Sequence, residues 1–541
     1  MFLLLLLPQS AADEPAGLFH EVLLAEETTS GSVEKDYILE INGGGLLLGD
    51  FDSDGDADLV VVDGSTIARA QAGAPGFPPR LLLNDGAGGF SRAGEEWDMA
   101  GGRWGMGGAV GDVNGDGRPD LFLTEWGPDR LFLNRGGKGF EEVTEQAGFR
   151  GSRWGASAAF LDYERDGFLD LAVVNYLSFR LDELPASRTD GGCTWHGIGV
   201  MCGPEGMIPV HDQLYRGGGD GTFADVSGAA KFRPREAAFG LGVVTLDHDV
   251  DGDTDLYITN DSTPNHLWDN QGDGTFAEIA MRRGVDRDPN GKEQAGMGIA
   301  TGDLNADGRP DIFVTNFSAE NNALYVSARR GYRDGSDRAR LGGHSLRYLG
   351  WGTSMTDFDL DGDLDLVVFN GHVYPQADMP GTDTTYAQPD FLYRNDGANV
   401  FAPEPLTGRP PTVSRACAAG DLNGDGFVDL VALDLGGPVR VLLNRGSGDG
   451  HFLRVRLRGA GPNRLGLGAR LTARWGDRSR TVEITSAGGY QAAVLPEAHF
   501  GLGAAEKVDE LVVRWPSGVE QVLTDVAVDR VLVVEEQEQD G

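Results

Sequence analysis

Short runs of apolar and β-branched residues recur along the chain, and each run begins just after an acidic stretch that contains glycine. Residues 59–62 read LVVV and residues 256–259 read LYIT. Runs of this length and composition, bounded by turn residues, are typical of β-strands. Because the acidic stretch and its run occur seven times, the pattern predicts a repeated all-β architecture.

The repeat is longer than this one strand. An aromatic–glycine pair precedes most acidic stretches, as at Trp104 and Gly105, and a third segment such as 131–140 ends in a turn and an aromatic residue. A fourth short strand follows several copies, as at 140–143. Four short strands repeated roughly every 50–60 residues are typical of a β-propeller. We therefore expect an all-β fold, with a seven-bladed β-propeller over residues 18–453 and a small β-rich domain over residues 454–541.

The order of the strands also predicts how the ring closes. Residues 18–26 look like a fourth strand although they precede the first acidic stretch, whereas the seventh copy has no fourth strand of its own. An open strand edge favours aggregation. Residues 18–26 are therefore expected to complete the last blade, and the alternative is a loose N-terminal arm.

The acidic stretches share the pattern D-x-[DNE]-x-D-G-x-x-D and are numbered here as metal loops 1 to 7. Side-chain oxygens stand at positions 1, 3, 5 and 9, and position 7 offers its main-chain carbonyl. Ca²⁺ takes six to eight oxygen ligands, and glycine at position 6 allows the sharp turn that gathers them. The candidate ligands, loop by loop, are Asp50, Asp52, Asp54, Asp56 and Asp58; Asp112, Asn114, Asp116, Arg118 and Asp120; Asp162, Glu164, Asp166, Phe168 and Asp170; Asp247, Asp249, Asp251, Asp253 and Asp255; Asp303, Asn305, Asp307, Arg309 and Asp311; Asp357, Asp359, Asp361, Asp363 and Asp365; and Asp421, Asn423, Asp425, Phe427 and Asp429.

Other metals and other loop types fit this pattern less well. An EF-hand needs Glu at position 12, but that position is apolar in every copy, as at Val61 and Leu123. Mg²⁺ keeps its waters, and transition metals favour His or Cys, which the repeat lacks. One such stretch alone is as well explained as a turn, but seven complete copies predict about seven bound Ca²⁺. Loops 1, 3, 4 and 6 carry four acids against three in the others, so we expect them to bind more tightly.

Composition limits the class of partner. The chain has 541 residues, of which 40% are hydrophobic, and a net charge of −39 at pH 7. This length exceeds one ordinary core unless the core is built from repeats. The excess of acids argues against nucleic acid as a partner, since phosphates are bound by Lys and Arg.

The cysteines and the N-terminus bear on the compartment. Cys193 and Cys202 lie close together in a glycine-rich insertion, and they either form a disulfide in an exported protein or remain free thiols. Cys417 is expected to be a buried, small apolar residue. Residues 1–17 resemble a signal-peptide remnant or an N-terminal arm, without a basic start. No stretch is long enough to span a membrane, so we expect a secreted, periplasmic or cell-surface protein.

A second set of polar residues stands five positions after ligand position 9. These side chains form either a ring on the face opposite the metal loops or caps for their own turns; they are Asp63, Glu125, Asn175, Asn260, Asn316, Asn370 and Asp434. The insertions 64–80, 177–212 and 371–390 follow the same positions, and long loops on a rigid scaffold often carry recognition. Their aromatic residues either stack on a sugar or peptide or pack the loops' own small cores; they are Trp126, Tyr176, Trp195 and Tyr374.

The repeats over about 18–453 resemble FG-GAP/VCBS repeats, which are also found in the integrin α-subunit propeller. The rest of the chain resembles the ASPIC/UnbV domain, on the segments 463–470, 488–490, 499–503 and 515–518. Together they resemble the secreted, calcium-binding family that includes cartilage acidic protein, which implies integrin-α-like calcium loops. The family usually has Ser-Gln shortly after the Gly-Tyr of the last domain, whereas Gln491 follows here.

The sequence carries no familiar catalytic motif. His372 is the best isolated candidate for chemistry, with Asp357 or Glu125 as partners, although a structural histidine is the more ordinary interpretation. We expect a non-enzymatic, calcium-binding adhesion or recognition module for a protein or glycan that binds opposite the calcium loops. The alternative is a propeller enzyme, either a polysaccharide lyase or hydrolase or a participant in natural-product biosynthesis.

Overall fold

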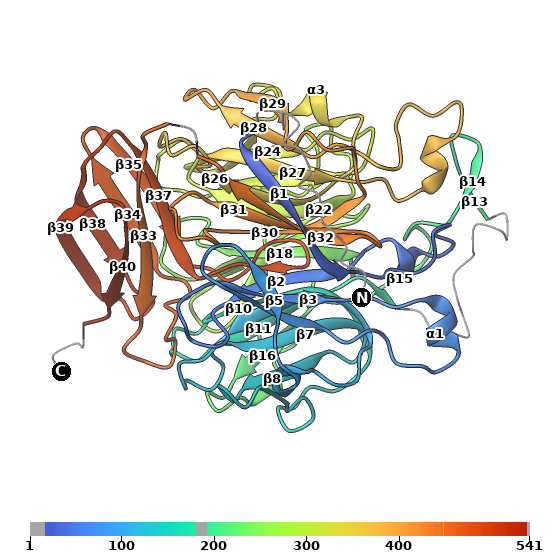
Figure 1. Ribbon diagram of the computed structural model, residues 1–541, viewed down its shortest axis with the longest axis horizontal. Coiled ribbons are helices and arrows are strands. Elements are labelled where there is room, and N and C mark those ends of the chain that lie inside the picture. The colour runs from blue at the N-terminus through green and yellow to red at the C-terminus, as the bar shows by residue number, and fades with distance from the viewer. Residues whose placement is uncertain (1–16, 179–191, 447, 538–541) are drawn as a thin grey trace, which may run out of the picture.

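The computed structural model describes residues 17–178, 192–446 and 448–537. The predicted signal-peptide remnant falls almost wholly in residues 1–16, outside the described residues. The regular secondary structure of the described chain is mostly β-strand, which confirms the predicted class, and its first part forms antiparallel four-stranded units that we call blades 1 to 7 (Figure 1). Within the described ranges, none of the helices combines the length and the apolar character needed to cross a membrane.

Each blade is built from strands in chain order, except that an insertion separates the second and third strands of blade 3 and the first described strand of the chain completes blade 7. Blade 1 has β2 (Gly45–Gly49), β3 (Asp58–Val62), β4 (Arg80–Asn84) and β5 (Phe90–Arg92); blade 2 has β6 (Trp104–Gly111), β7 (Asp120–Gly127), β8 (Arg130–Asn134) and β9 (Phe140–Glu142); blade 3 has β10 (Arg153–Leu161), β11 (Asp170–Asn175), β16 (Gln213–Gly217) and β17 (Phe223–Asp225). Blade 4 has β18 (Gly240–Leu246), β19 (Asp255–Asn260), β20 (His266–Asn270) and β21 (Phe276–Glu278); blade 5 has β22 (Gly296–Gly302), β23 (Asp311–Asn316), β24 (Ala323–Ala328) and β25 (Gly331–Asp334). Blade 6 has β26 (Gly350–Thr356), β27 (Asp365–Asn370), β28 (Phe391–Asn395) and β29 (Phe401–Pro405); blade 7 has β30 (Ser414–Gly420), β31 (Asp429–Asp434), β32 (Pro438–Asn444) and β1 (Phe19–Glu27).

The blades form a closed, propeller-like ring. Their first strands contact one another in the order β2, β6, β10, β18, β22, β26 and β30, and β30 contacts β2 again. A short pairing of β7 with β10 also joins blades 2 and 3. The second strand of each blade is buried on both faces between neighbouring blades, which explains why runs such as Leu59–Val62 are continuously apolar rather than alternating.

The predicted closure of the ring is confirmed. β1 pairs antiparallel with β32, with Phe19 opposite Asn444 and Leu23 opposite Arg440. The Phe19 ring packs against Phe358 of metal loop 6 at a centroid distance of 5.7 Å. The first described strand therefore completes the last blade and covers its outer edge.

The C-terminal unit begins at β33 and contains two small sheets and one inserted segment. Its strands are β33 (His451–Arg458), β34 (Arg470–Trp475), β35 (Arg478–Glu483), β36 (Ala492–Ala493), β37 (Glu497–Gly503), β38 (Lys507–Arg514), β39 (Glu520–Ala527) and β40 (Arg530–Glu535). The sheet orders are β37-β33-β40 and β35-β34-β38-β39. β36 leaves this unit and pairs in parallel with β2 of blade 1. The unit lies on one side of the ring, at the left in Figure 1.

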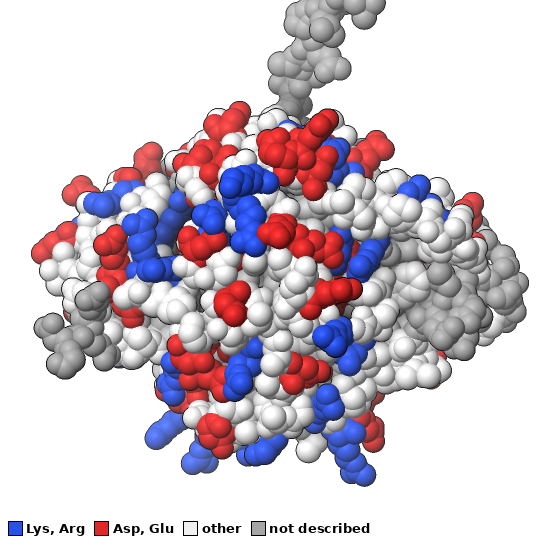
Figure 2. Space-filling model, turned by 90° about the horizontal axis from the view of Figure 1, so that it is seen from below, with Lys and Arg blue, Asp and Glu red and all other residues white. Residues whose placement is uncertain are grey.

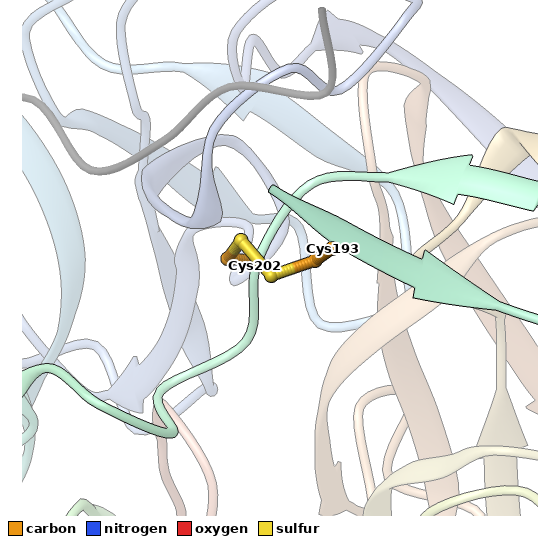
Figure 3. The surroundings of a disulfide bond; sticks show 2 residues. All are labelled: Cys193 and Cys202. Atoms are coloured by element: carbon orange, nitrogen blue, oxygen red, sulfur yellow. A yellow bond between two sulfur atoms is a disulfide. The ribbon is translucent and has the colours of Figure 1, made fainter. Parts of the chain in front are cut away.

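Insertions gather on the other side of the ring, at the right in Figure 1. Their elements and the remaining short helices are η1 (Ile38–Glu40), α1 (Ile67–Gln71), η2 (Glu95–Trp97), β12 (Leu177–Ser178), β13 (Cys193–Trp195), β14 (Ile198–Val200), β15 (Ile208–Pro209), α2 (Ala280–Arg283), α3 (Gly342–Ser345) and η5 (Pro375–Asp378). Cys193 and Cys202 form a disulfide with a Cα–Cα distance of 5.3 Å, which ties the β13–β14 hairpin to the segment after it (Figure 3). Cys417 is a buried free thiol in β30.

Candidate metal centres

All seven metal loops share one local geometry. In each, the backbone N–H of the position-6 glycine donates to the position-1 carboxylate over 2.7–3.2 Å. Each of these glycines has a positive φ, between 77° and 100°, which side chains other than glycine adopt at a cost. The N–H of position 7 donates to the carboxylate at position 5 in every loop. These bonds fold the acids at positions 1 and 5 into one compact turn.

The position-9 acid is the most buried of the acidic residues at the ligand positions of each loop. Asp120, at the start of β7, accepts one backbone hydrogen bond from Val113 at 3.0 Å and another from Asn134 at 2.8 Å. The corresponding acids of the other loops accept the same two kinds of bond. Burial raises the pKa of Asp58 to about 7 and those of Asp120 and Asp429 to about 8. The fold thus buries carboxyl groups that lack a positive charge, an arrangement that a bound dication would relieve.

Some carboxylate oxygens at ligand positions have no protein partner. The buried Oδ1 atoms of Asp50 and Asp303, both at position 1, accept no hydrogen bond within the described chain, and neither does the Oδ1 of Asp359 at position 3. Such atoms are costly unless something else satisfies them. Three groups of loop acids also bring their oxygens within 4.8 Å of one another; these are Asp50, Asp52 and Asp58, then Asp247, Asp249 and Asp251, then Asp357, Asp359 and Asp361. The donor set is all oxygen and fits Ca²⁺.

Nearby arginines distinguish the four-acid loops from one another. Arg394 Nη1 lies 2.5 Å from Asp359 in loop 6, and Arg283 Nη2 lies 3.3 Å from Asp249 in loop 4. The side chains at the ligand positions of loop 1 have no such ion pair among the described residues. A guanidinium beside a ligand reduces its attraction for a cation. Loop 1 is therefore expected to bind Ca²⁺ more tightly than loops 4 and 6, because the guanidinium that contacts it, that of Arg456, donates to a backbone carbonyl and not to a ligand carboxylate.

The sequence interpretation missed an asparagine that joins neighbouring loops. Asn134, at the end of β8, donates through Nδ2 to the carbonyl of Phe51 in metal loop 1 at 2.8 Å. Equivalent asparagines make the same bond to the preceding loop; they are Asn84 to Leu422, Asn270 to Tyr163 and Asn444 to Phe358. The recurring Asn before the turn of the third segment was the available signal. These bonds fix one metal loop against the next.

The polar residues five positions after position 9 do not form an open ring. All seven are buried, so the idea of an open polar binding surface there is wrong, and the capping alternative holds for Asn260 and Asn316. Asn260 and Asn316 donate to the carbonyls of Pro264 and Asn321 in their own turns. Glu125 instead pairs with the buried Arg130, whose Nη2 lies 2.7 Å away. Backbone groups and a buried arginine thus contact these side chains, although the buried Oδ1 atoms of Asn175, Asn260 and Asn316 accept no hydrogen bond within the described chain.

The predicted aromatic residues on this side partly pack on one another. Tyr176 is buried and donates through its hydroxyl to Asp261 at 2.6 Å. Trp195, half-buried in the disulfide-tied hairpin, lies 5.7 Å from the Tyr374 ring and 4.8 Å from that of His372 by centroid distance. Trp126 is also half-buried and packs against Trp104. The hairpin thus reaches across to blade 6, and part of the Trp195 and Tyr374 surface remains open.

His372 contacts neither of the carboxylates considered for it. Its Nδ1 accepts from the backbone N–H of Tyr374 at 3.1 Å, and its Nε2 lies 3.2 Å from the Ser318 hydroxyl. Burial lowers its pKa to about 3. Asp357 lies in metal loop 6, where it accepts from Gly362. His372 is therefore a neutral ring that holds the 371–390 insertion in place.

A segment of the C-terminal unit also enters the centre of the ring. Tyr490 donates to the carbonyl of Asn42 at 2.8 Å and packs against the Trp351 ring at 5.0 Å. The backbone N–H of Gln491 donates to Ser157 in blade 3, and its carbonyl accepts from Leu46 in blade 1. Residues 489–493 are thus a plug held by the innermost strands of several blades.

Comparison with known families identifies both parts of the chain. The family described as FG-GAP-like repeat matches residues 50–123, 112–173, 247–314 and 303–368, which include metal loops 1 to 6. The family described as ASPIC and UnbV matches residues 459–541.

Curated relatives cover only part of the chain. Cartilage acidic protein 1 of Xenopus tropicalis is 29% identical over 280 residues, which is 49% of this chain and 40% of that protein. The Homo sapiens protein is 29% identical over 281 residues, which is 49% of this chain and 39% of that protein. The matched region is therefore less than half of either relative.

Among solved structures, the similarity is weak. The BP39L lectin of Burkholderia pseudomallei is 14% identical with a TM-score of 0.45, covering 75% of this chain and 98% of that chain. A lectin of Agrocybe aegerita, described as recognising non-reducing terminal N-acetylglucosamine, is 15% identical with a TM-score of 0.39, covering 73% and 86%. The repeats, the terminal domain and the curated relatives together assign the chain: it combines FG-GAP-like repeats with a C-terminal ASPIC and UnbV domain and is a distant homologue of cartilage acidic protein 1.

Proposed function

We propose that this protein is an exported, calcium-binding recognition module without enzymatic activity. Calcium ions in integrin-α-like loops hold a seven-bladed propeller rigid, and a protein or glycan partner binds the face opposite the loops. The unpartnered, buried oxygens of Asp50, Asp303 and Asp359 carry this proposal, because each stands at a predicted ligand position within a complete set of oxygen donors.

The residues that would hold calcium are the side chains at positions 1, 3, 5 and 9 of each loop, with the position-7 carbonyl. When bound, Ca²⁺ supplies the positive charge that buried acids such as Asp120 and Asp365 lack. The protein's own contribution is geometric: the position-6 glycine and the backbone hydrogen bonds orient the oxygens before the ion arrives. Extracellular modules bind Ca²⁺ with a Kd of about 10⁻⁴–10⁻³ M.

Support for the partner face comes from the insertions around the disulfide. The β13–β14 hairpin places Trp195 beside Tyr374, and both rings remain partly exposed. Aromatic faces next to polar groups suit a sugar ring or a peptide side chain. Figure 2 shows the outer side of the ring from below, where acidic and basic side chains are interspersed. The disulfide supports export to an oxidising compartment.

A binding screen tests the proposal. The full chain is applied to glycan arrays and to extracellular protein libraries, with 2 mM Ca²⁺ or EDTA as typical conditions for sites of about millimolar affinity. Substitution of Trp195 by Ala should abolish the calcium-dependent signal, whereas substitution of the exposed Val522 on β39 should leave it intact. A partner bound equally well by the Trp195 variant would place recognition elsewhere. If elemental analysis finds no calcium in protein that was purified with millimolar Ca²⁺, the calcium-binding part of the proposal is refuted.

A further inference from the structure

The C-terminal unit lies on the metal-loop side of the ring and touches several loops directly. Arg456 Nη1 donates to the carbonyl of Gly55 in loop 1 at 3.0 Å, and Arg478 Nη1 donates to the carbonyl of Asp361 in loop 6 at 2.7 Å. His499 Nε2 lies 2.8 Å from the carbonyl of Gly426 in loop 7. The unit therefore presents cationic and donor side chains to the same loops that are expected to hold cations.

Two further arginines of the unit contact a position-1 carboxylate, and the longer of these contacts joins Arg470 to Asp247 of loop 4 at 3.6 Å. Arg454 of β33 donates through Nη1 to Oδ2 of Asp421, the position-1 acid of loop 7, at 2.7 Å. The Arg454 side chain is 5% exposed and that of Asp421 is 1% exposed, so water screens this pair weakly. On its other edge, Arg454 makes a two-point contact with Glu497, from Nε and Nη2, each at 3.0 Å. The guanidinium is thus fixed beside loop 7 by its own domain.

Loop 7 also has few negative charges with which to bind a cation beside the Arg454 guanidinium. It has three acids at its ligand positions, because position 3 is Asn423, whereas loop 1 has four. Asp421 already uses both oxygens for the backbone N–H groups of Gly424 and Gly426. A guanidinium and a dication that share one buried carboxylate repel each other.

We propose that Arg454 and the cation of loop 7 compete for Asp421, so that calcium binding to loop 7 and the docking of β33 weaken each other. This inference rests on the proposed calcium function. Coupling between two binding events is reciprocal and commonly changes affinity by about fivefold or more. The plug at residues 489–493 keeps the C-terminal unit on the ring, so calcium loosens β33 locally and does not release the whole unit.

Loop 1 and Arg456 provide matched controls within the same network. Arg456 Nε also contacts Glu497, at 2.9 Å, but its other bond is to a carbonyl at position 6, which is not a ligand position. Replacing Arg456 by Met therefore disturbs the same Glu497 contact without removing a guanidinium that touches a ligand carboxylate of loop 7. Replacing Arg454 by Met removes the competitor from Asp421.

The experiment follows amide hydrogen exchange of loop 7 (421–429) and loop 1 (50–58) in the full chain as free Ca²⁺ is raised. In R454M, the calcium midpoint for protection of loop 7 should fall about fivefold or more, while that of loop 1 stays unchanged. R456M should leave the loop 7 midpoint at its wild-type value. An unchanged loop 7 midpoint in R454M overturns the inference while loop 1 still reports calcium binding. If calcium protects no loop in the wild type, both the inference and the proposed function fail.

A reciprocal measurement on the unmodified chain covers the case in which R454M does not fold. Exchange in β33 (451–458) should increase as loop 7 becomes protected by calcium. The variant Asp425→Asn removes one of the three acids of loop 7, and in it the same calcium range should leave β33 exchange nearly constant. A β33 that becomes more protected with calcium in the wild type would overturn the competition.

Discussion

Two buried carboxylates at opposite ends of one strand have different requirements. Asp120 begins β7 at metal loop 2, and Glu125 lies five residues later, near the other end of the same strand. Asp120 accepts only backbone hydrogen bonds, whereas Glu125 pairs with the buried guanidinium of Arg130. Both are almost fully buried, at 0% and 1% exposure. Burial of an acid is therefore no sign of a metal site by itself, and neither is burial without a cation, since Asp212 is buried outside the metal loops and, within the described chain, accepts only from the backbone N–H of Asn175. What marks the metal loops is that several acids bring their oxygens together as well.

The same difference separates the two faces of the ring. On the metal-loop face, the acids repeat in every blade and several of their oxygens lack partners. On the opposite face, Asn260 and Asn316 donate to backbone carbonyls, although their own buried Oδ1 atoms also lack a donor, so the unpartnered oxygens there belong to neutral amides and not to carboxylates. The variable feature of this face is the set of insertions around the disulfide. The repeated face is therefore suited to holding the ring together, and the variable face is suited to recognition.

Of the changes that distinguish the two faces, calcium removal should have the largest effect on the stability of the protein. Each occupied loop contributes about 2.7 kcal/mol when free Ca²⁺ is 100 times its Kd, and about seven loops act on one ring. EDTA is therefore expected to lower the melting temperature strongly, and Mg²⁺ at equal concentration should restore less of it than Ca²⁺. Differential scanning calorimetry in each buffer checks this. Identical melting curves with Ca²⁺ and with EDTA would remove the distinction between the two faces.

The calcium-free protein should also depend on pH in an unusual direction. Burial raises the folded-state pKa of Asp120 and Asp365 to about 8 and that of Asp311 to about 7. An unfolded Asp has a pKa of about 3.9. Between these values the folded state binds more protons than the unfolded state, so the free energy of unfolding falls as the pH rises from about 4 to about 8.

Urea unfolding in EDTA at pH 5 and at pH 8 measures this dependence. The protein should be less stable at pH 8. With saturating Ca²⁺ the loop carboxylates are ionised in the folded state as well, so the decrease between pH 6 and pH 8 should become smaller; a residual decrease is expected from Asp129 and Asp212, which lie outside the metal loops and whose pKa burial raises to about 8 and about 7. Equal stability at pH 5 and pH 8 without calcium would show that the position-9 acids are compensated by some other charge.

Substitutions at the two ends of β7 should separate the two kinds of acid. Glu125→Gln leaves the buried Arg130 without its carboxylate and should cost about 3–5 kcal/mol, equally with Ca²⁺ and with EDTA. Asp120→Asn resembles the protonated acid, so it should cost much less in EDTA than in Ca²⁺. The free energy of unfolding of each variant, measured by urea titration with Ca²⁺ and with EDTA, distinguishes the two roles. A loss for Asp120→Asn that does not depend on calcium would assign Asp120 a purely structural role.

The metal loops were predictable because their determinants are local. The bond from Gly55 to Asp50 and the turn it closes lie within nine residues, so the residue types and their spacing already specify the geometry. The strands were equally accessible, since a strand buried between two blades must be apolar throughout. The pairing of β1 with the last blade was predictable because residues 18–26 look like a fourth strand and the seventh copy lacks one. No individual contact was needed for that prediction.

Contacts between distant segments were not predictable in the same way. Tyr490 and Asn42 are 448 residues apart in the sequence. No local pattern indicates that the Gly-Tyr turn of the C-terminal unit enters the centre of the ring. The polar residues at the far ends of the second strands were ambiguous for a different reason. A sequence shows that Asn316 is polar, but only the structure shows that its amide donates to the carbonyl of Asn321.

The smallest expected effect concerns the link between adjacent metal loops. Asn134→Ala removes the bond from blade 2 to the carbonyl of Phe51 in loop 1 and should cost about 1–3 kcal/mol, because a buried carbonyl loses its donor. Asn395 is the matched control: it occupies the same place in blade 6, but its amide donates to Leu364 and Asn399 of its own blade. Asn134→Ala should therefore increase hydrogen exchange in loop 1 of the neighbouring blade, whereas Asn395→Ala should increase exchange only within blade 6. If both variants instead increase hydrogen exchange in the neighbouring blade to the same extent, the metal loops are coupled through the packing of the blades alone. Asn134 would then contribute stability without joining one metal loop to the next.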